Sequence, residues 1–206
     1  MRLTRREAAV AFGLTGGAAL ASPAQADELI ADLIGDKDEF VAASEAYIYG
    51  YPLVTMEMTR RIVTNVASVE GTRGPMGQLI KLRSYPNAKF RDVTAPNADT
   101  LYTTSFLDVS KEPWVFSIPD MKGRYFLFPM LSGWTDVFQV PGTRTTGTGA
   151  QTYAITGPGW KGALPPGVVE YKSPTGIVWL LGRIYCTGTP EDYAAVHALQ
   201  DACKLY

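Results

Sequence analysis

Between residues 100 and 185 the sequence consists of short segments rich in β-branched and aromatic residues, separated by turn residues such as Gly, Pro, Asp and Ser. These segments predict strands, and they follow one another without the alternating helices of a parallel sheet. We therefore expect an antiparallel β-sandwich or jelly-roll. Residues 177–185 are almost continuously apolar, which is typical of a central strand covered on both faces. The expected strands span residues 100–109, 114–118, 124–130, 134–140, 152–157, 168–172 and 177–185.

Helical patterns flank these strands on both sides, so the expected class is α+β. Residues 38–50 carry an apolar stripe at helical spacing. Pro52 and the preceding Gly50 predict a break before a second helix, because proline cannot continue the hydrogen-bond ladder. A last helix over residues 189–206 begins with Thr189 as its cap and Pro190 at its first position, and Asp192 is expected to reach back to the cap.

The last helix has one apolar and one polar face at a period of 3.6 residues. We expect the only histidine, His197, to lie in solvent on the polar face with Tyr193, Gln200 and Lys204. The opposite, buried face is expected to contain Ala195, Val196, Leu199, Ala202 and Cys203.

The N-terminus has the pattern of an export signal. Arg2, Arg5 and Arg6 precede an apolar run over residues 8–21, and the small residues that follow end in an A-x-A cleavage pattern at Ala26. The run is too short to span a bilayer, which needs about 20 residues. Arg5 and Arg6 resemble a twin-arginine signal, with the general secretory route as the alternative. The sequence thus predicts a periplasmic or secreted protein with a signal over residues 1–26.

The remainder divides into a helical extension over residues 27–66, a β-sandwich-like domain over residues 67–188 and the helix over residues 189–206. Residues 1–26 contain three Arg and one Glu of the 19 basic and 20 acidic residues, so the rest of the chain has a net charge of −3. No basic run follows the signal, which argues against nucleic acid as a partner. No later stretch is long and apolar enough to span a membrane.

Several kinds of active site are disfavoured. A Ser-His-Asp triad lacks a base because the one histidine is expected in solvent. No Cys or His residues have zinc spacing, and the Gly-rich residues 68–78 lack the ending of a phosphate-binding loop. Cys186 and Cys203 are expected about 20 Å apart along the last helix, so we interpret both as buried hydrophobes rather than a disulfide. The sequence identifies no cofactor and no metal site.

Polar residues inside apolar strands make residues 97–144 the candidate site. Asp136 is the sharpest case, because strand alternation places it on one face with Trp134, Phe138 and Val140. A carboxylate on an apolar face is costly unless it is paired or functional, so a satisfied structural role and a functional role both stay open. The other candidates in this stretch are Asn97, Asp99, Tyr102, Arg124, Tyr125 and Arg144.

Asp99 and Asp136 would form an acid and base pair, as in glycoside hydrolysis, if they met in one cleft. Aromatic side chains would then stack on sugar rings: Tyr102, Tyr125 and Trp134. A three-residue loop over residues 131–133 sets a hairpin register in which Arg124 faces Val140. Arg124 is then expected about 13 Å from Asp136 and not as its partner.

Long motifs resemble a known family. They read EAYIYGYPLV from Glu45, NADTLYTTSFLDVS from Asn97, GRYFLFPMLSGWTDVF from Gly123, GTRTTGT from Gly142, GPGWKGALPPG from Gly157 and SPTGIVWLLGR from Ser173. From about Glu39 to the end, the chain resembles the family called domain of unknown function 1254. The resemblance implies a β-sandwich-like domain with helical additions, usually followed by a second β domain called domain of unknown function 1214. It also implies that this chain is an N-terminal part whose partner is that missing domain, and it brings no catalytic residues.

Together these patterns predict an exported protein that binds or hydrolyses a small polar or glycan-like ligand. Asp99 and Asp136 are the catalytic candidates. The alternative is a non-catalytic binding or assembly module of the cell envelope in which the same residues are structural, and assembly with further copies of the chain stays open. The ligand-binding candidates are Asn97, Tyr102, Arg124, Tyr125, Trp134 and Arg144.

Overall fold

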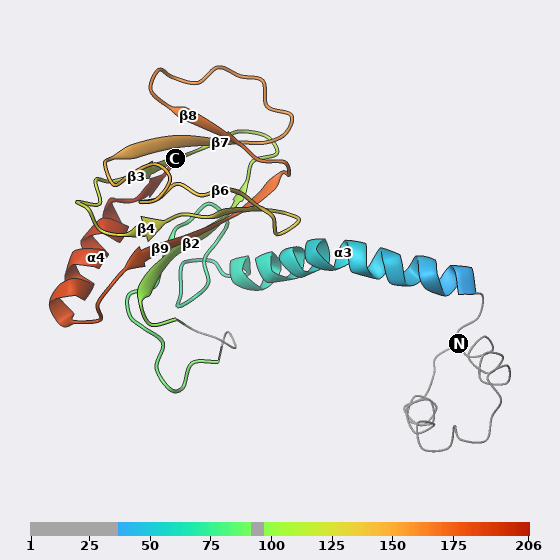
Figure 1. The fold of residues 1–206 in the computed structure, drawn as a ribbon, viewed down its shortest axis with the longest axis horizontal. Helices are drawn as coiled ribbons and strands as arrows, with labels where there is room; N and C mark the ends of the chain where they lie inside the picture. The colour runs from blue at the N-terminus through green and yellow to red at the C-terminus, as the bar shows by residue number, and fades with distance from the viewer. Residues whose placement is uncertain (1–36, 92–96) are drawn as a thin grey trace. The chain divides into compact units, whose positions relative to one another are not determined.

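A computed structural model describes residues 37–91 and 97–206 (Figure 1). The predicted export signal over residues 1–26 lies outside the described residues. The chain divides into two compact units, Met1–Tyr51 and Pro52–Tyr206. In the described part no helix has both the length and the apolar character needed to cross a membrane.

The first described helix, α3 (Lys37–Thr64), is continuous and contains Pro52 in its interior, so the predicted break at this proline is wrong. Proline removes one backbone hydrogen bond, and the helical turns after it are supported by side-chain pairs. Glu57 accepts hydrogen bonds from Arg60 and Arg61, each at 2.7 Å and at spacings of three and four residues. The hydrogen bonds from both arginines, with that from Arg60 the stronger, lower the pKa of the Glu57 carboxyl to about 2.

The larger sheet is built around β9 (Ile177–Tyr185), which pairs antiparallel with three strands. Its central position confirms the prediction, but residues along β9 alternate between buried and half-buried. The strand is therefore fully buried on one face only, and the expectation of two covered faces is wrong. The other strands of this sheet are β1 (Ile80–Lys81), β2 (Thr100–Asp108), β4 (Phe126–Leu127), β5 (Met130–Ser132) and β6 (Val137–Gln139).

The smaller sheet forms the second layer, visible in Figure 1 as β3, β7 and β8. Its β7 and β8 run parallel, which departs from the expected purely antiparallel pattern, while its other pairs are antiparallel. Two β-sheets and the two described helices make the fold α+β, as predicted. In order across the sheet the strands are β10 (Lys204–Leu205), β3 (Trp114–Ile118), β7 (Gln151–Thr156) and β8 (Val169–Lys172).

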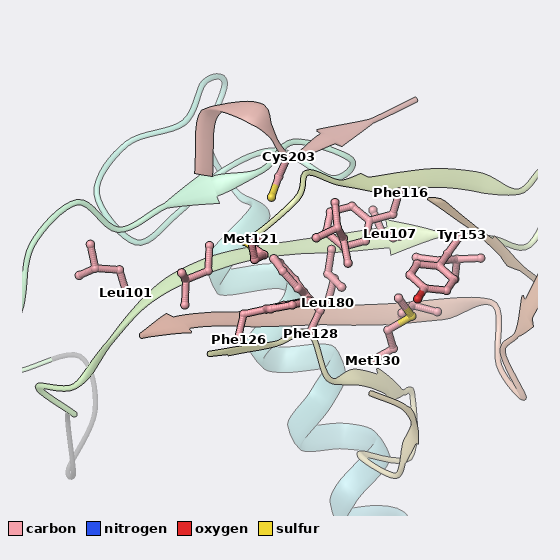
Figure 2. Close-up of a cluster of buried hydrophobic side chains, with 14 of the residues drawn as sticks. Leu101, Leu107, Phe116, Met121, Phe126, Phe128, Met130, Tyr153, Leu180 and Cys203 are labelled. Carbon is pink, nitrogen blue, oxygen red and sulfur yellow. The ribbon is translucent and has the colours of Figure 1, made fainter. Parts of the chain in front are cut away.

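Large apolar side chains from both sheets fill the space between the layers (Figure 2). Phe116 of the smaller sheet packs edge-on against Phe128 of the 126–130 segment, with ring centroids 4.9 Å apart. Leu180 of β9 is fully buried in the same cluster. Burial of these side chains stabilises the fold by roughly 1.5–3 kcal/mol each. One face of the larger sheet therefore belongs to the core, and the other is available to carry a site.

The hairpin of β5 and β6 differs from its predicted register. Met130 pairs with Gln139 and Leu131 with Val137, with a bulge between them. The turn is closed by the amide of Ser132, which donates to the carbonyl of Asp136 at 2.8 Å. Thr135 takes the left-handed conformation, with φ of 69°. The turn is thus longer than three residues, so the predicted facing of Arg124 and Val140 is also wrong.

The last helix, α4 (Pro190–Ala202), has the predicted cap: the Thr189 side chain accepts from the amide of Asp192. It ends at Ala202, and residues 204–205 form β10 instead of a further helical turn. The predicted faces are partly wrong, because Gln200 is fully buried while Ala195 and Ala202 are exposed. Cys186 and Cys203 are free and buried, which confirms their assignment as small core residues.

Candidate functional site

Most of the predicted site residues lie around one end of β9. The backbone of Asp99 accepts from the amide of Cys186 at 3.0 Å, and the backbone of Tyr125 accepts from the amide of Tyr185 at 2.9 Å. These contacts place the segments that begin at Asn97 and Arg124 on either side of β9. Only Trp134 and Asp136 among the predicted residues lie at the opposite end, next to the β5–β6 turn.

Two cross-strand rows define the outer face of the larger sheet at this end. In the first row Arg183 lies between Tyr102 of β2 and Leu127 of β4. In the second row Tyr185 lies opposite Thr100, with Tyr125 on its other side. We call Tyr102, Tyr125, Arg144, Arg183 and Tyr185 the tyrosine–arginine face.

Tyr102 is held in place through its hydroxyl oxygen. The oxygen accepts one hydrogen bond from the Asn97 side-chain amide at 2.7 Å and one from Arg183 Nη2 at 2.6 Å. Asn97 is oriented in turn by its carbonyl oxygen, which accepts from the backbone and the hydroxyl of Thr100, each at 3.1 Å. Asn97 therefore closes a backbone turn, as asparagine often does, and it also positions Tyr102.

Arg183 packs on the ring of Tyr102, with Cζ 5.0 Å from the ring centroid. Its Nε is buried without a hydrogen-bond partner among the described residues. Leaving a buried N–H unsatisfied costs about 1–3 kcal/mol, so the fold accepts an energetic penalty to hold this guanidinium on the sheet. Arg183 makes no ion pair within residues 37–91 or 97–206.

A second arginine and two further tyrosines extend the face toward solvent. Arg144 lies over the ring of Tyr125, with Cζ 5.6 Å from its centroid. Tyr125 is 36% exposed and Tyr185 43% exposed. Exposed aromatic rings beside cations suit a ring-shaped polar ligand, because the rings offer flat contact area while the cations offer hydrogen bonds.

Arg124 does not belong to this face. It points to the other side of the sheet and forms a two-pronged ion pair with Asp192 of α4, at 2.6 and 3.1 Å. The hydrogen bonds from Arg124 lower the pKa of the Asp192 carboxyl well below its usual range, and the backbone amide of Thr187 adds to this effect. The predicted ligand-binding residue Arg124 is thus committed to anchoring α4.

The structure does not bring the two predicted catalytic carboxylates together. Asp99 bonds through its backbone to Cys186, whereas the hairpin that carries Asp136 pairs with Val178 through Ser132. The eight-residue offset along β9 corresponds to about 25 Å. Carboxyl pairs in glycosidases lie roughly 5–9.5 Å apart. Both side chains are exposed, so the expected placement of Asp136 on an apolar face is wrong.

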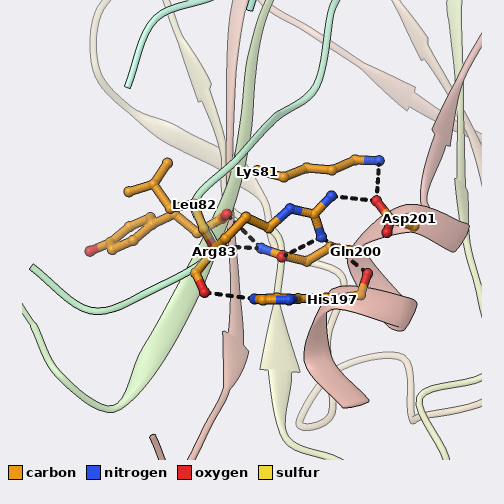
Figure 3. Close-up of polar contacts among 7 residues, drawn as sticks. Lys81, Leu82, Arg83, His197, Gln200 and Asp201 are labelled. Carbon is orange, nitrogen blue, oxygen red and sulfur yellow. Dashed lines mark hydrogen bonds and ion pairs between the residues drawn. The ribbon is translucent and has the colours of Figure 1, made fainter. Parts of the chain in front are cut away.

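A polar network joins β1 and its extension to α4 (Figure 3). The buried Gln200 donates to the carbonyls of Leu82 and Tyr102 at 3.1 and 2.9 Å. Arg83 donates to Gln200 and pairs with Asp201, which also pairs with Lys81 at 3.1 Å. His197 donates from Nε2 to the carbonyl of Arg83 at 2.6 Å, so the prediction that it lies free in solvent is wrong.

These contacts make the network a clamp between elements. Its polar groups bond to one another across the two elements. The sequence could not reveal the network, because its two halves lie more than 110 residues apart.

Sequence reasoning missed Arg183 and Tyr185. The signal was present, because alternation along a half-buried strand places both residues on the face opposite the buried Ile184 and Gly182. It was overlooked because the strand was expected to be covered on both faces. A hollow of about 420 Å³ lies outside the tyrosine–arginine face, against Ser117, Gln151, Lys204 and Tyr206. No cluster of three or more metal-binding side chains occurs in the part of the chain that the structure describes.

Comparisons with known proteins agree with this fold. Residues 76–206 match the family model described as protein of unknown function, DUF1254. The VPA0106 protein from Vibrio parahaemolyticus has a similar crystal structure, with a TM-score of 0.60 and 24% identity over 78% of this chain and 36% of that one. This likeness shows the fold alone.

A second solved structure, of an uncharacterized protein from Burkholderia cenocepacia, covers 53% of this chain and 33% of its own length at 10% identity. Its TM-score of 0.35 is too low to support a structural argument. The chain thus spans about a third of the length of each solved structure. No curated protein matches it.

Proposed function

The chain belongs to the DUF1254 family of proteins of unknown function. We propose that it is an exported protein that binds a small polar or glycan-like ligand on its tyrosine–arginine face. One observation carries the proposal. Two arginines on this face contact tyrosines and form no ion pair with a described residue. Both arginines can therefore bind an external ligand, whereas Arg124 is ion-paired with Asp192.

Two hypotheses are compared: ligand binding, and hydrolysis catalysed by the predicted acid and base pair. Ligand binding is the better supported of the two. Asp99 and Asp136 are too far apart to act on one bond, as the distance along β9 shows. Tyr125 and Tyr185 offer exposed rings in adjacent strand positions, as sugar-binding surfaces commonly do. The proposed role of the face is thus recognition of a ring-bearing ligand.

A thermal-stability screen with neutral and acidic oligosaccharides tests this proposal. A ligand that binds only the folded chain raises its melting temperature by mass action. We expect at least one saccharide to do so, and we expect Tyr125→Ser and Tyr185→Ser to abolish the shift. Tyr206→Ser is the matched control, because Tyr206 is 70% exposed and lies on the other sheet. Absence of a shift for every saccharide, or an equal loss with Tyr206→Ser, would contradict the proposal.

Export is the second part of the proposal, and it is supported by the sequence pattern of residues 1–26. Cell fractionation would test it. The chain should accumulate outside the cytoplasm with its N-terminus at Asp27, and replacement of Arg5 and Arg6 by lysine should retain it inside if the twin-arginine route is used. Efficient export of the double-lysine variant would instead assign the general secretory route.

The alternative, a non-catalytic assembly module, is favoured by one surface. Val54, Met58 and Ile62 of α3 are 62%, 50% and 60% exposed and recur at every fourth residue, so they form one apolar stripe. Exposed apolar stripes commonly mark protein contacts. A further β domain of the kind that the family resemblance implies would be a suitable partner, since the Vibrio protein is longer than the matched region.

A further inference from the structure

The hydroxyl group of Tyr102 has an unused hydrogen. A tyrosine hydroxyl has two acceptor lone pairs and one donor hydrogen. Both lone pairs are occupied, by the N–H groups of Asn97 and Arg183. The hydrogen must therefore point away from these two partners, and no described residue accepts it. Tyr102 thus presents a hydrogen-bond donor to whatever lies on the face.

Arg183 supplies further donors at the same point. Only its Nη2 donates to a described residue, the hydroxyl of Tyr102. The ring of Tyr102 beneath it and the hydrogen bond to the Tyr102 hydroxyl hold the guanidinium in place on the sheet. A fixed arginine and a neighbouring hydroxyl donor match the two oxygens of a carboxylate, which accept without donating.

No described carboxylate of the adjacent strands competes for these donors. Asp99 lies one residue before Thr100, and alternation turns its side chain to the opposite face. In agreement, the pKa of Tyr85, which bonds to Cys186 on that side, is raised mainly by burial and in smaller part by the charge of Asp99. Asp108 lies at the far end of β2, opposite Ile177. Among the described residues, the arginines of the tyrosine–arginine face therefore have no paired carboxylate.

We infer that the ligand of this face is an acidic carbohydrate whose carboxylate is bound by Tyr102 and Arg183; the inference rests on the proposed function. The ring of the sugar then lies toward Tyr185, which is two residues along β9 and so about 6.6 Å away. Tyr125 flanks Tyr185. Arg144, which lies over the ring of Tyr125, binds the acid group of a second sugar unit. The recognised class is thus a uronic acid oligomer rather than a neutral glycan.

Calorimetric titration of the full chain with trigalacturonate and with its methyl ester tests the inference. The ester keeps the sugar rings and removes the charge. We expect the acid to bind at least about tenfold more tightly than the ester, and Arg183→Gln to weaken binding of the acid by about 10–100-fold, because a hydrogen bond to a charged group is lost. Tyr102→Phe should weaken it less, because only the hydroxyl donor to the carboxylate is removed while the arginine stays.

Arg73→Gln is the matched control, because Arg73 is exposed and lies outside the face. Sodium acetate at equal concentration separates a bare carboxylate from a sugar acid, and it should bind far more weakly. Equal affinity for acid and ester would overturn the inference while leaving the proposed function intact. Absence of binding by both saccharides, together with no response to any neutral glycan, would reject both. Unchanged affinity in Arg183→Gln would also overturn the inference.

Discussion

Arg124 and Asp192 show how a single residue pair ties a helix to the sheet. Their side chains are 20% and 17% exposed, which makes this the least exposed ion pair among the described residues. Asp192 also accepts from the amide of Thr187 just before the helix begins. The carboxylate thus serves the helix start and the sheet together.

We expect Asp192→Asn to lower the free energy of unfolding by about 1–3 kcal/mol at neutral pH, because charged hydrogen bonds are lost. The folded pKa of Asp192 is depressed, so its stabilising effect is present above the unfolded value of about 3.9 and disappears as pH falls toward the folded value. Urea unfolding at pH 7 and at about pH 2 should show a smaller difference in acid. Asp136→Asn is the control, and an equal difference at both pH values would rule out this explanation.

Gly182 is required by the core. A Cβ at this position would lie 2.1 Å from the Phe128 ring and 2.6 Å from the carbonyl of Thr103. We expect Gly182→Ala to cost about 1–3 kcal/mol through overpacking, measured by chemical unfolding. Gly159→Ala, where no atom lies within 4 Å, should change stability by less than about 0.5 kcal/mol. Similar stability of the two variants would refute the packing argument.

At the scale of elements, α4 is held on the sheet edge by Gln200. Replacing it with methionine keeps the side-chain volume but removes the donor to the carbonyl of Leu82 and leaves the carbonyl of Tyr102 with only the backbone amide of Leu82. We expect Gln200→Met to cost about 1–3 kcal/mol in unfolding free energy. Gln139→Met, at an exposed position of β6, should be nearly neutral. Faster amide exchange confined to α4 would support the clamp, and unchanged stability would contradict it.

Elements with a strong local pattern could be predicted from the sequence. The bounds of β3 and β9 agree with the prediction, because alternation and turn residues mark their ends. The two-residue strands β1, β4 and β10 carry no such pattern and form only through distant partners. The same reason limited the prediction of the site. Asn97 and Tyr102 are near neighbours in sequence, whereas Arg183 contacts Tyr102 across 81 residues.

At the scale of the whole molecule, apolar surface remains on α3. Val54, Met58 and Ile62 form a stripe that water contacts in the isolated chain. We expect the chain to self-associate as its concentration rises, since such patches promote association. Replacing the three residues with glutamine should shift it toward the monomer in analytical ultracentrifugation. Identical sedimentation of both forms would argue against an assembly role for this stripe.

The two faces of the larger sheet have different roles. One face of the larger sheet packs into the core, and the other presents arginines and tyrosines around the end of β9. The family match and the likeness to the Vibrio protein concern this fold, whereas the chemistry of the face comes from a few side chains. The place where the ligand binds therefore decides whether the tyrosine–arginine face is the site.

The most direct test is a map of backbone amide shifts in the full chain during titration with trigalacturonate. The account predicts that shifts concentrate at Tyr102, Tyr125, Arg183 and Tyr185, and that they weaken as salt is added, because salt screens exposed charges. Amides of the β5–β6 turn around Asp136 should stay unchanged. Shifts centred on that turn or on the hollow beside Gln151, with none around Arg183, would contradict the account.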